Sequence, residues 1–420
     1  MSSTRVTAAA LPQIHLTPQD EVELRELSFQ LEQEIVSHYE DFLTIHNGRV
    51  DATRWQHIKS EGTLAAYKEK SGALHHDRHA YSFAKDAQNP RPQAEMAMKS
   101  TLPRVLVTGT VPGTLDDVMH GSTFQHTGGL RAHWAYQKAF MEDGAVLAKI
   151  DGATLDDPYR FLGVTWVLRK YKLPAVLVNN RDLLSLSDHR LSRLSSGERI
   201  GIAFTHSIQH RDLTELREFS TIRVNSSLLQ VFRQVGADRV EVFLLHFLDT
   251  RGSVSESFHL QESIKVVLPS TAAFCDAGLS KKLLYLLRER ALNRQAGAIE
   301  PMGSGDDSHC DLCSKSLSKL FGSSGTTCRL CSKVSKPFQR CTGSHVCSRC
   351  SVPRDLIIDT STKKPLIQTL EFCVQCFLQA KKLPTLPIAQ ETARWSHHSE
   401  TKRDGELRST SSTEDSTYSL

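Results

Sequence analysis

The chain has 420 residues, a hydrophobic content of 39% and a net charge of +4. This length is more than one ordinary core occupies, and it predicts two or three folded units. The longest apolar runs, such as residues 174–178 and 243–248, are far shorter than the ~20 residues that a membrane-spanning helix needs. We therefore expect a soluble protein whose contact with a membrane can only be peripheral.

The positive charge is concentrated near the C-terminus. Residues 310–382 contain twelve Lys and Arg against four Asp and Glu, which leaves a net charge of −4 on the rest of the chain. A compact basic surface favours partners that carry phosphate, either anionic lipid headgroups or nucleic acid, although it can also be a solvated lysine-rich surface. Few aromatic side chains accompany these charges to stack on bases, which argues against nucleic acid.

The N-terminal part of the chain is predicted to be helical after a disordered segment, residues 1–17. Thr17-Pro18, followed by two acidic residues, is typical of a helix start, with a hydroxyl cap and proline at the first helical position. Apolar residues then recur at spacings of three and four up to Phe42, which predicts one long amphipathic helix. A second helix is predicted over residues 51–70, around Trp55.

A series of short β-rich segments follows. Polar turns separate them, which favours antiparallel strands joined by hairpins or short loops. The predicted strands are residues 104–111, 145–150, 160–168, 175–186, 199–208, 220–233 and 239–248. Residues 114–141, between the first two strands, are predicted to be helical, and a closing helix is predicted over residues 270–290, directly after Pro269.

Eight of the ten cysteines lie in four Cys-x-x-Cys pairs near the C-terminus. The pairs are Cys310/Cys313, Cys328/Cys331, Cys347/Cys350 and Cys373/Cys376. A structural zinc ion takes four ligands, so the pairs predict two Zn²⁺ ions with two pairs each and no open position for catalysis. The alternative is a disulfide framework, but residues 1–12 lack the pattern of a secretion signal, which favours a reducing, cytoplasmic location.

Polar segments flank this zinc region. The glycine-rich residues 296–308 predict a linker, and the zinc module then covers residues 309–382. Residues 383–420 are rich in Ser, Thr and charged side chains and are predicted to be a disordered tail.

The order of helices and strands resembles the START-like lipid-transfer fold. Segments similar to Gly109–Thr114 with Asp116–Val118, Phe161–Trp166 and Arg181-Asp182 occur in that order in START-like domains. The resemblance covers residues 18–295 and implies an α+β helix-grip fold, an antiparallel sheet around a long C-terminal helix with a cavity for a hydrophobic lipid. Arg181 and Trp166 are the candidate cavity residues, although strand alternation allows only one of Arg181 and Asp182 to face inward. A structural ion pair is the alternative role.

The zinc region resembles a FYVE-type finger in which the four pairs are cross-braced. The resemblance implies that Cys310, Cys313, Cys347 and Cys350 bind one ion. Cys328, Cys331, Cys373 and Cys376 would bind the other. The finger is degenerate, because the family's basic run before the second pair is reduced to Cys328-Arg329 and Glu371 stands where an arginine is expected. Chains that join a START-like domain to a FYVE-related finger form a family that this sequence resembles.

The finger also carries candidate membrane contacts. Leu320-Phe321 occupies the region of the membrane-inserting tip of FYVE-type fingers, next to Lys315 and Lys319, and Arg329 adds a further positive charge. Burial of two apolar side chains in the lipid interface contributes about 2–4 kcal/mol, and each lysine near an anionic surface adds about 1 kcal/mol, which gives weak, reversible binding. The alternative is a small hydrophobic plug between the zinc sites.

The sequence contains no Walker loop, nucleophile elbow, dinucleotide fingerprint or kinase motif, so we expect no enzymatic activity. The leading hypothesis is a lipid-binding protein on anionic, phosphoinositide-containing membranes, cytoplasmic and peripheral on endosomes. The alternative is a protein-interaction adaptor or a RING-like ubiquitin ligase component. The all-cysteine pairs disfavour a RING, which normally includes histidine.

Overall fold

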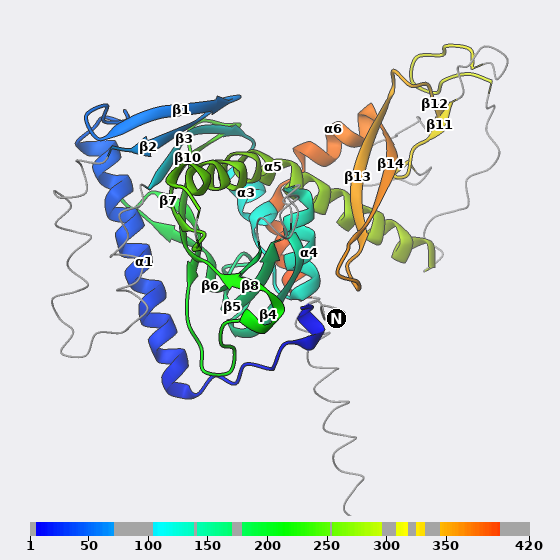
Figure 1. Ribbon diagram of the computed structural model, residues 1–420. Coiled ribbons are helices and arrows are strands. Elements are labelled where there is room, and N and C mark those ends of the chain that lie inside the picture. The colour runs from blue at the N-terminus through cyan, green and yellow to red at the C-terminus, as the bar shows by residue number, and fades with distance from the viewer. Residues whose placement is uncertain are drawn as a thin grey trace, which may run out of the picture.

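The computed structural model describes residues 6–70, 104–137, 141–169, 179–252, 254–295, 308–317, 325–331 and 345–394. Within these ranges the fold is α+β: a large antiparallel sheet with a long helix on each of its two faces, and a small cysteine-rich module beside it (Figure 1). The fold class predicted from the sequence is therefore confirmed.

Helix α1 (Pro18–Thr44) packs on the outer face of the sheet. It begins with a capping box in which Thr17 and Asp20 bind each other's backbone N–H groups, as the sequence predicts. Its apolar stripe, including Ile35, Tyr39 and Phe42, joins the larger of the hydrophobic clusters in the described chain. The same cluster holds the outward-facing residues of the central strands, so α1 covers one side of the sheet and leaves the other for the remaining helices.

The main sheet has ten strands in the described residues, in the order β1-β2-β3-β10-β9-β7-β6-β5-β4, with the short β8 beside β6. All neighbours are antiparallel except β6 and β8. The strands are β1 (Trp55–Glu61), β2 (Leu64–Glu69), β3 (Val105–Pro112), β4 (Met141–Asp151), β5 (Phe161–Arg169), β6 (Asn180–Arg193), β7 (Arg199–Ser207), β8 (Thr221–Arg223), β9 (Asn225–Gln234) and β10 (Arg239–Asp249). Each predicted strand corresponds to strand structure here, but the one predicted over 220–233 is divided into β8 and β9, and the one predicted over 175–186 is described from residue 179 onward.

The predicted second helix, residues 51–70, is wrong: these residues form the β1–β2 hairpin at the sheet edge. Gly62 makes the turn with a positive φ of 58°, a conformation that favours glycine. Glu69 is buried between Arg54 and Arg104, with N–O distances of 2.8 and 2.9 Å. Arg104 is distant in sequence, so a local pattern could not reveal the pairing that makes this segment a hairpin.

In the described residues the inner face of the sheet is covered by helices α3 (Leu115–Ser122), α4 (Thr127–Tyr136) and α5 (Glu256–Gln295). The predicted helix over 114–141 is thus divided into two. Helix α5 begins before its predicted start and contains Pro269 in its interior. Next to the proline, Ser270 Oγ donates to the carbonyl of Val266 at 2.6 Å and Thr271 Oγ1 to that of Val267 at 2.7 Å. Proline removes the helical donor to the Lys265 carbonyl, and these two hydroxyls bond to the carbonyls that follow it in the same turn.

Two segments predicted to be disordered are ordered in part. Within residues 6–17, Val6 and Ile14 are buried and the Ala8 N–H donates to Asp143 Oδ2 at 2.8 Å. Residues 385–394, in the predicted tail, form a helix that buries Ile388 and Ala389. For residues 6–17 and 385–394 the predictions are wrong, because a few apolar side chains in a polar stretch are enough to order it once they can pack on a neighbouring surface. Residues 1–5 and 395–420 lie outside the described residues.

The cysteine-rich module is packed against α5. It consists of β11 (Thr326–Thr327), β12 (His345–Val346), β13 (Ser351–Asp359), β14 (Leu366–Cys373) and α6 (Val374–Lys382). The leucines of the second half of α5, such as Leu283, form one hydrophobic cluster with Leu356 and Phe372 of the module. Residues 296–307 of the predicted linker lie outside the described residues. The module is nevertheless packed on the body. No helix in the described residues is long and apolar enough to span a bilayer.

Candidate functional sites

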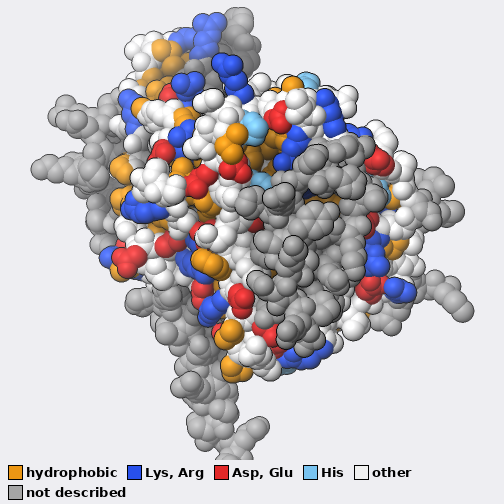
Figure 2. Space-filling view, turned by 90° about the vertical axis from the view of Figure 1, so that its left-hand side faces the viewer, with side chains coloured by type: hydrophobic (Ala, Val, Ile, Leu, Met, Phe, Trp, Pro, Cys, Tyr) orange, Lys and Arg blue, Asp and Glu red, His pale blue; other side chains and the backbone are white. Residues whose placement is uncertain are grey.

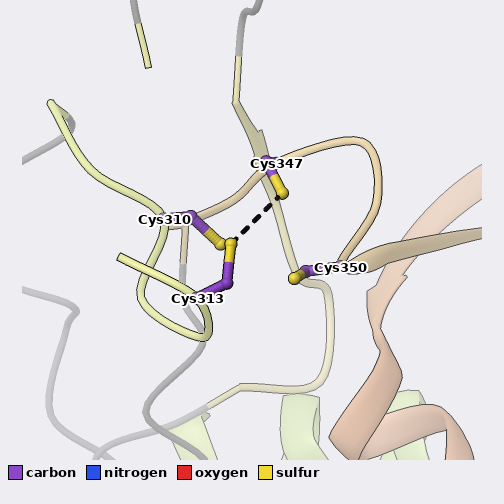
Figure 3. A group of neighbouring side chains, drawn as sticks. All are labelled: Cys310, Cys313, Cys347 and Cys350. Atoms are coloured by element: carbon purple, nitrogen blue, oxygen red, sulfur yellow. Dashed lines mark hydrogen bonds between the residues drawn. The ribbon is translucent and has the colours of Figure 1, made fainter. Parts of the chain in front are cut away.

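The first cysteine cluster consists of Cys310, Cys313, Cys347 and Cys350, whose sulfur atoms lie within 4.8 Å of one another (Figure 3). Two turns carry the pairs. The turns meet where the Asp311 N–H donates to the carbonyl of His345 at 2.9 Å and the His345 N–H donates to Asp311 Oδ2 at 2.7 Å. Cys313 is exposed and Cys350 half-buried, so this cluster lies at the surface of the module.

The second cluster consists of Cys328, Cys331, Cys373 and Cys376, again with all sulfur atoms within 4.8 Å. Cys373 caps the start of α6, where its Sγ accepts the Cys376 N–H at 3.4 Å. All four cysteines are buried. The first pair in sequence therefore meets the third, and the second meets the fourth, which is the grouping that a cross-braced finger has.

Both clusters have the dimensions of a tetrahedral metal site. The sulfur–sulfur distances are 3.7 Å for Cys313–Cys347 and 3.6 and 3.8 Å from Cys331 to Cys373 and Cys376. Four thiolates at about 2.3 Å from a tetrahedral zinc ion are about 3.8 Å apart. Four sulfurs per cluster would complete the coordination of a metal ion, so the geometry fits a structural role.

The thiols are partly prepared for deprotonation. Burial opposes ionisation of Cys310, but N–H groups of Cys347, Leu312 and Cys313 lower its pKa to about 6. A hydrogen bond from Cys331 is the main reason that the pKa of Cys328 falls to about 7. Since the thiolate is the metal ligand, these shifts favour metal binding by Cys310 and Cys328 near neutral pH, whereas burial and hydrogen bonds with the neighbouring cysteines raise the pKa of Cys350 to about 12.

Of the five predicted membrane contacts, only Lys315 and Arg329 lie in the described residues, and both are exposed. Lys319, Leu320 and Phe321 lie outside these residues, as does Cys341, the spare cysteine between the second and third pairs. His345, in the same region, is not part of either cluster and packs on Gly325.

The body contains an internal cavity of about 110 Å³ between the sheet and helices α4 and α5. Apolar residues of α4 and α5 form one wall, among them Leu130, Val266 and Phe274. The opposite wall is the inner face of the central strands.

The strand wall of the cavity is rich in polar side chains, which the sequence analysis missed. Alternate residues of the strands point inward. The inward residues form two rows across β6, β7 and β9, His189–Ala203–Gln230 and Ser187–Thr205–Leu228, and Ser185 and Ser226 also line the cavity. Hydroxyls bond along this face, with Thr165 Oγ1 at 2.9 Å from Ser185 Oγ and 2.8 Å from Ser187 Oγ. In the sequence, the serines at alternate positions of β6 were the signal from which this polar wall could have been predicted.

The predicted cavity residues have different positions. Arg181 borders the cavity, but its guanidinium donates to the backbone carbonyls of Asn179 and Thr250 at 2.5 and 2.7 Å. Trp166 does not line the cavity: it is buried in the cluster under α1, and its indole N–H donates to Asp182 at 2.9 Å. Its alternation along β5 places it on the opposite face of the sheet. Asp182 also borders the cavity and pairs with Arg223 at 2.7 Å.

A second cavity of about 220 Å³ adjoins the first, with which it shares Val224 and Ser226 in its lining. Its lining is more polar and includes His210, Glu215 and Arg251, the last two of which form an ion pair at 2.6 Å.

The histidines of the main cavity are neutral. Burial lowers the pKa of His189 and of His246 to about 3 and holds that of His133 well below its usual value. His246 has partners on both nitrogens, Ser263 at 2.5 Å and Ser226 at 3.1 Å. The cavity wall is therefore polar without being charged at these positions.

Comparisons with known proteins are sparse. No family model matches this chain, and no curated protein matches it. Among solved structures, it is similar to human STARD10, with 15% identity, a TM-score of 0.37 and coverage of 63% of this chain and 90% of that chain. For human StAR-related lipid transfer protein 5 the values are 13%, 0.38, 60% and 97%. For a StAR-related lipid transfer protein from Xanthomonas axonopodis they are 14%, 0.34, 53% and 98%. The likeness is distant, so function must be argued from the cavity and the cysteine clusters themselves.

Proposed function

We propose that this protein is a non-enzymatic lipid-binding protein, cytoplasmic and peripheral on endosomal membranes. In this proposal a START-like body holds a hydrophobic ligand, and a FYVE-related finger with two Zn²⁺ ions contacts anionic membranes. The observation that carries the proposal is the internal cavity under α5, which has an apolar wall of helices and adjoins a second cavity. Ligand sites are typically such concave, mainly apolar spaces with a few polar groups.

Zinc is the metal that the clusters favour. Sulfur-only ligand sets with tetrahedral spacing are typical of structural zinc, and iron–sulfur clusters are the principal alternative. A zinc ion held by each cluster would connect segments of the module that have little other core, because β11, β12 and the Cys-x-x-Cys turns are short. The metal would therefore act on folding and not on chemistry.

The membrane contact is supported by charge. The exposed Lys315 and Arg329 belong to the region with twelve Lys and Arg against four Asp and Glu. On the face of the protein seen in Figure 2, by contrast, basic and acidic side chains are interspersed among the described residues. Electrostatic attraction to an anionic surface would therefore orient the finger toward the lipid.

Native mass spectrometry of the full chain, purified under reducing conditions, tests the ligand and the metal together. We expect two zinc ions per chain and an additional mass of a bound lipid. A chain without a co-purified lipid that also fails to take up any lipid offered to it would refute the body's role. A coloured preparation containing iron would refute the assignment to zinc.

Liposome flotation tests the membrane contact. The double variant Lys315→Glu and Arg329→Glu should weaken binding to anionic vesicles, because each basic residue contributes about 1 kcal/mol near such a surface. The matched control is the double variant Lys59→Glu and Arg217→Glu, which reverses one exposed lysine and one exposed arginine of the body. Equal flotation of the two variants would contradict the proposed orientation.

A further inference from the structure

Four buried polar atoms of residues that line the main cavity have no hydrogen-bond partner in the described residues: Trp134 Nε1, Asp182 Oδ1, His189 Nδ1 and Gln230 Oε1. The last two belong to residues that share one register row of the sheet. These two residues are only 5% and 4% exposed. Buried polar groups in folded proteins are nearly always paired, and an unpaired one costs free energy. Such atoms at a cavity wall therefore indicate a partner that occupies the cavity.

The two residues stand in one row of the sheet, on either side of Ala203. His189 on β6 is paired with Ala203 on β7, which is paired in turn with Gln230 on β9. The outer two backbones are thus about 10 Å apart, two strand spacings. Because the side chain between them is only a methyl group, space remains over Ala203 where one small polar group can reach both long side chains.

The chemistry of the two atoms defines that group. Gln230 Oε1 accepts a hydrogen bond, and the neutral imidazole of His189 can donate one from Nδ1. A hydroxyl group satisfies both, since it donates one hydrogen bond and accepts another. An ether or ester oxygen could only accept, and would leave the Gln230 oxygen unpaired.

The cations at the cavity are already paired, which disfavours an anionic head. Arg169 forms an ion pair with Glu262 at 2.7 Å. Arg181 donates to backbone carbonyls, and the histidines that line the cavity are neutral, as described above. A carboxylate or phosphate brought into this space would lose its hydration without gaining a free positive charge.

We propose, building on the lipid-binding function above, that the cavity selects neutral amphipathic ligands with a hydroxyl group and binds that hydroxyl between His189 and Gln230. The alkyl part of the ligand lies against the apolar wall formed by α4 and α5. The adjoining cavity, which shares Val224 and Ser226 with the first, provides room beyond the 110 Å³ of the main one.

A matched series of ligands tests the proposal: 1-dodecanol, its methyl ether and dodecanoate, titrated into the delipidated full chain by displacement of a fluorescent fatty probe. We expect the alcohol to bind about 5- to 10-fold more tightly than the ether, as one buried hydrogen bond provides, and more tightly than the carboxylate. Equal affinities of alcohol and ether, or preference for the carboxylate, would overturn the proposal while leaving lipid binding intact. Failure of all three ligands to bind, together with the absence of a co-purified lipid, would refute the proposed function itself.

The variant Gln230→Leu separates a ligand contact from a structural role. It removes the unpaired oxygen and keeps the approximate volume, so the thermal stability of the ligand-free protein should stay equal or rise. The affinity of this variant for the alcohol should fall to its affinity for the ether. Its affinity for the ether should equal that of the unsubstituted chain. The control is Gln56→Leu, at an exposed position on β1. If Gln230→Leu lowers the melting temperature and leaves the alcohol-to-ether ratio unchanged, the residue is structural and the proposal is wrong.

Discussion

Lys282 should hold the junction between the body, the end of the finger and the C-terminal helix. Its ammonium group is 1% exposed and lies 3.0 Å from Asp117 Oδ1, 3.0 Å from the carbonyl of Leu383 and 3.2 Å from Thr385 Oγ1. Asp117 belongs to α3, whereas Leu383 and Thr385 follow α6. One buried charge thus bonds three parts of the chain that are far apart in sequence.

Substitution of Lys282 by methionine would keep the volume and remove the charge. Removal of one partner from a buried ion pair costs about 3–5 kcal/mol, because the other charge is left uncompensated. Asp117 retains hydrogen bonds from Thr385 and Thr114. We therefore expect the lower end, about 3 kcal/mol. If the loss appears as local opening, it corresponds to roughly 100-fold faster exchange.

Hydrogen–deuterium exchange of the full chain measures this directly. Amides of residues 374–394 should exchange about 100-fold faster in Lys282→Met, whereas β9 and β10 should change little. The control on the same helix is Lys265→Met, whose side chain is 60% exposed. Exchange of residues 374–394 within about threefold of the unsubstituted chain would show that the ammonium does not stabilise the junction, and the reasoning from buried pairing would be refuted.

Three further predictions concern the sheet edge, the metal sites and the cavity. Glu69→Gln should destabilise the β1–β2 hairpin by about 3 kcal/mol, measured by exchange, because Arg54 and Arg104 lose a buried carboxylate. Burial alone would raise the pKa of Glu69, but both arginines lower it. The contribution of Glu69 to the stability of the fold is therefore fully present above pH 4.5 and is lost as the pH falls through the lower pKa of the folded state. The stability difference between the two proteins should therefore disappear in acid, and a difference that stays undiminished below the folded pKa would contradict this. Cys331→Ser should reduce bound zinc from two ions to one, whereas Cys275→Ser, outside both clusters, should keep two; metal analysis decides. Alcohol binding should be flat from pH 5 to 8, because the His189 pKa is about 3, and a titrating affinity near pH 6.5 would show the imidazole to be accessible to protons.

Local signals predicted most of the secondary structure. The start of α1 follows from a capping box within four residues, and each central strand follows from an apolar run between turns. The β1–β2 hairpin was missed because its stability depends on Arg104, which is distant from Glu69 in sequence. The helix at residues 385–394 was missed because it depends on Thr385 and Ile388 contacting the body, which no pattern within the tail indicates.

For the candidate sites too, the sequence predicted what local spacing determines and missed what contacts between distant segments determine. Spacing alone identified the eight cysteines, but it could not decide which pairs meet. That depends on contacts between distant segments, such as the Asp311 N–H bonding to the His345 carbonyl and the Arg329 N–H bonding to the Glu371 carbonyl, which no local pattern reveals. Arg181 and Trp166 were singled out as individual residues, although strand alternation separates them. The cavity wall is instead formed by rows of residues from neighbouring strands. A row such as His189–Ala203–Gln230 can be identified only when the pairing register of the strands is known.

Helix α5 connects the two proposed functions physically. Its first half lines the cavity through Val266 and Phe274, and its second half receives the finger through Leu283. Because an α-helix is stiff over a few turns, a force that moves the finger on a membrane would also act on the wall of the cavity. The 385–394 helix, which packs on the body and is bonded to Asp117 and Leu155, opposes such a movement. The more readily the Lys282 junction opens, the more strongly membrane contact would therefore be coupled to ligand exchange.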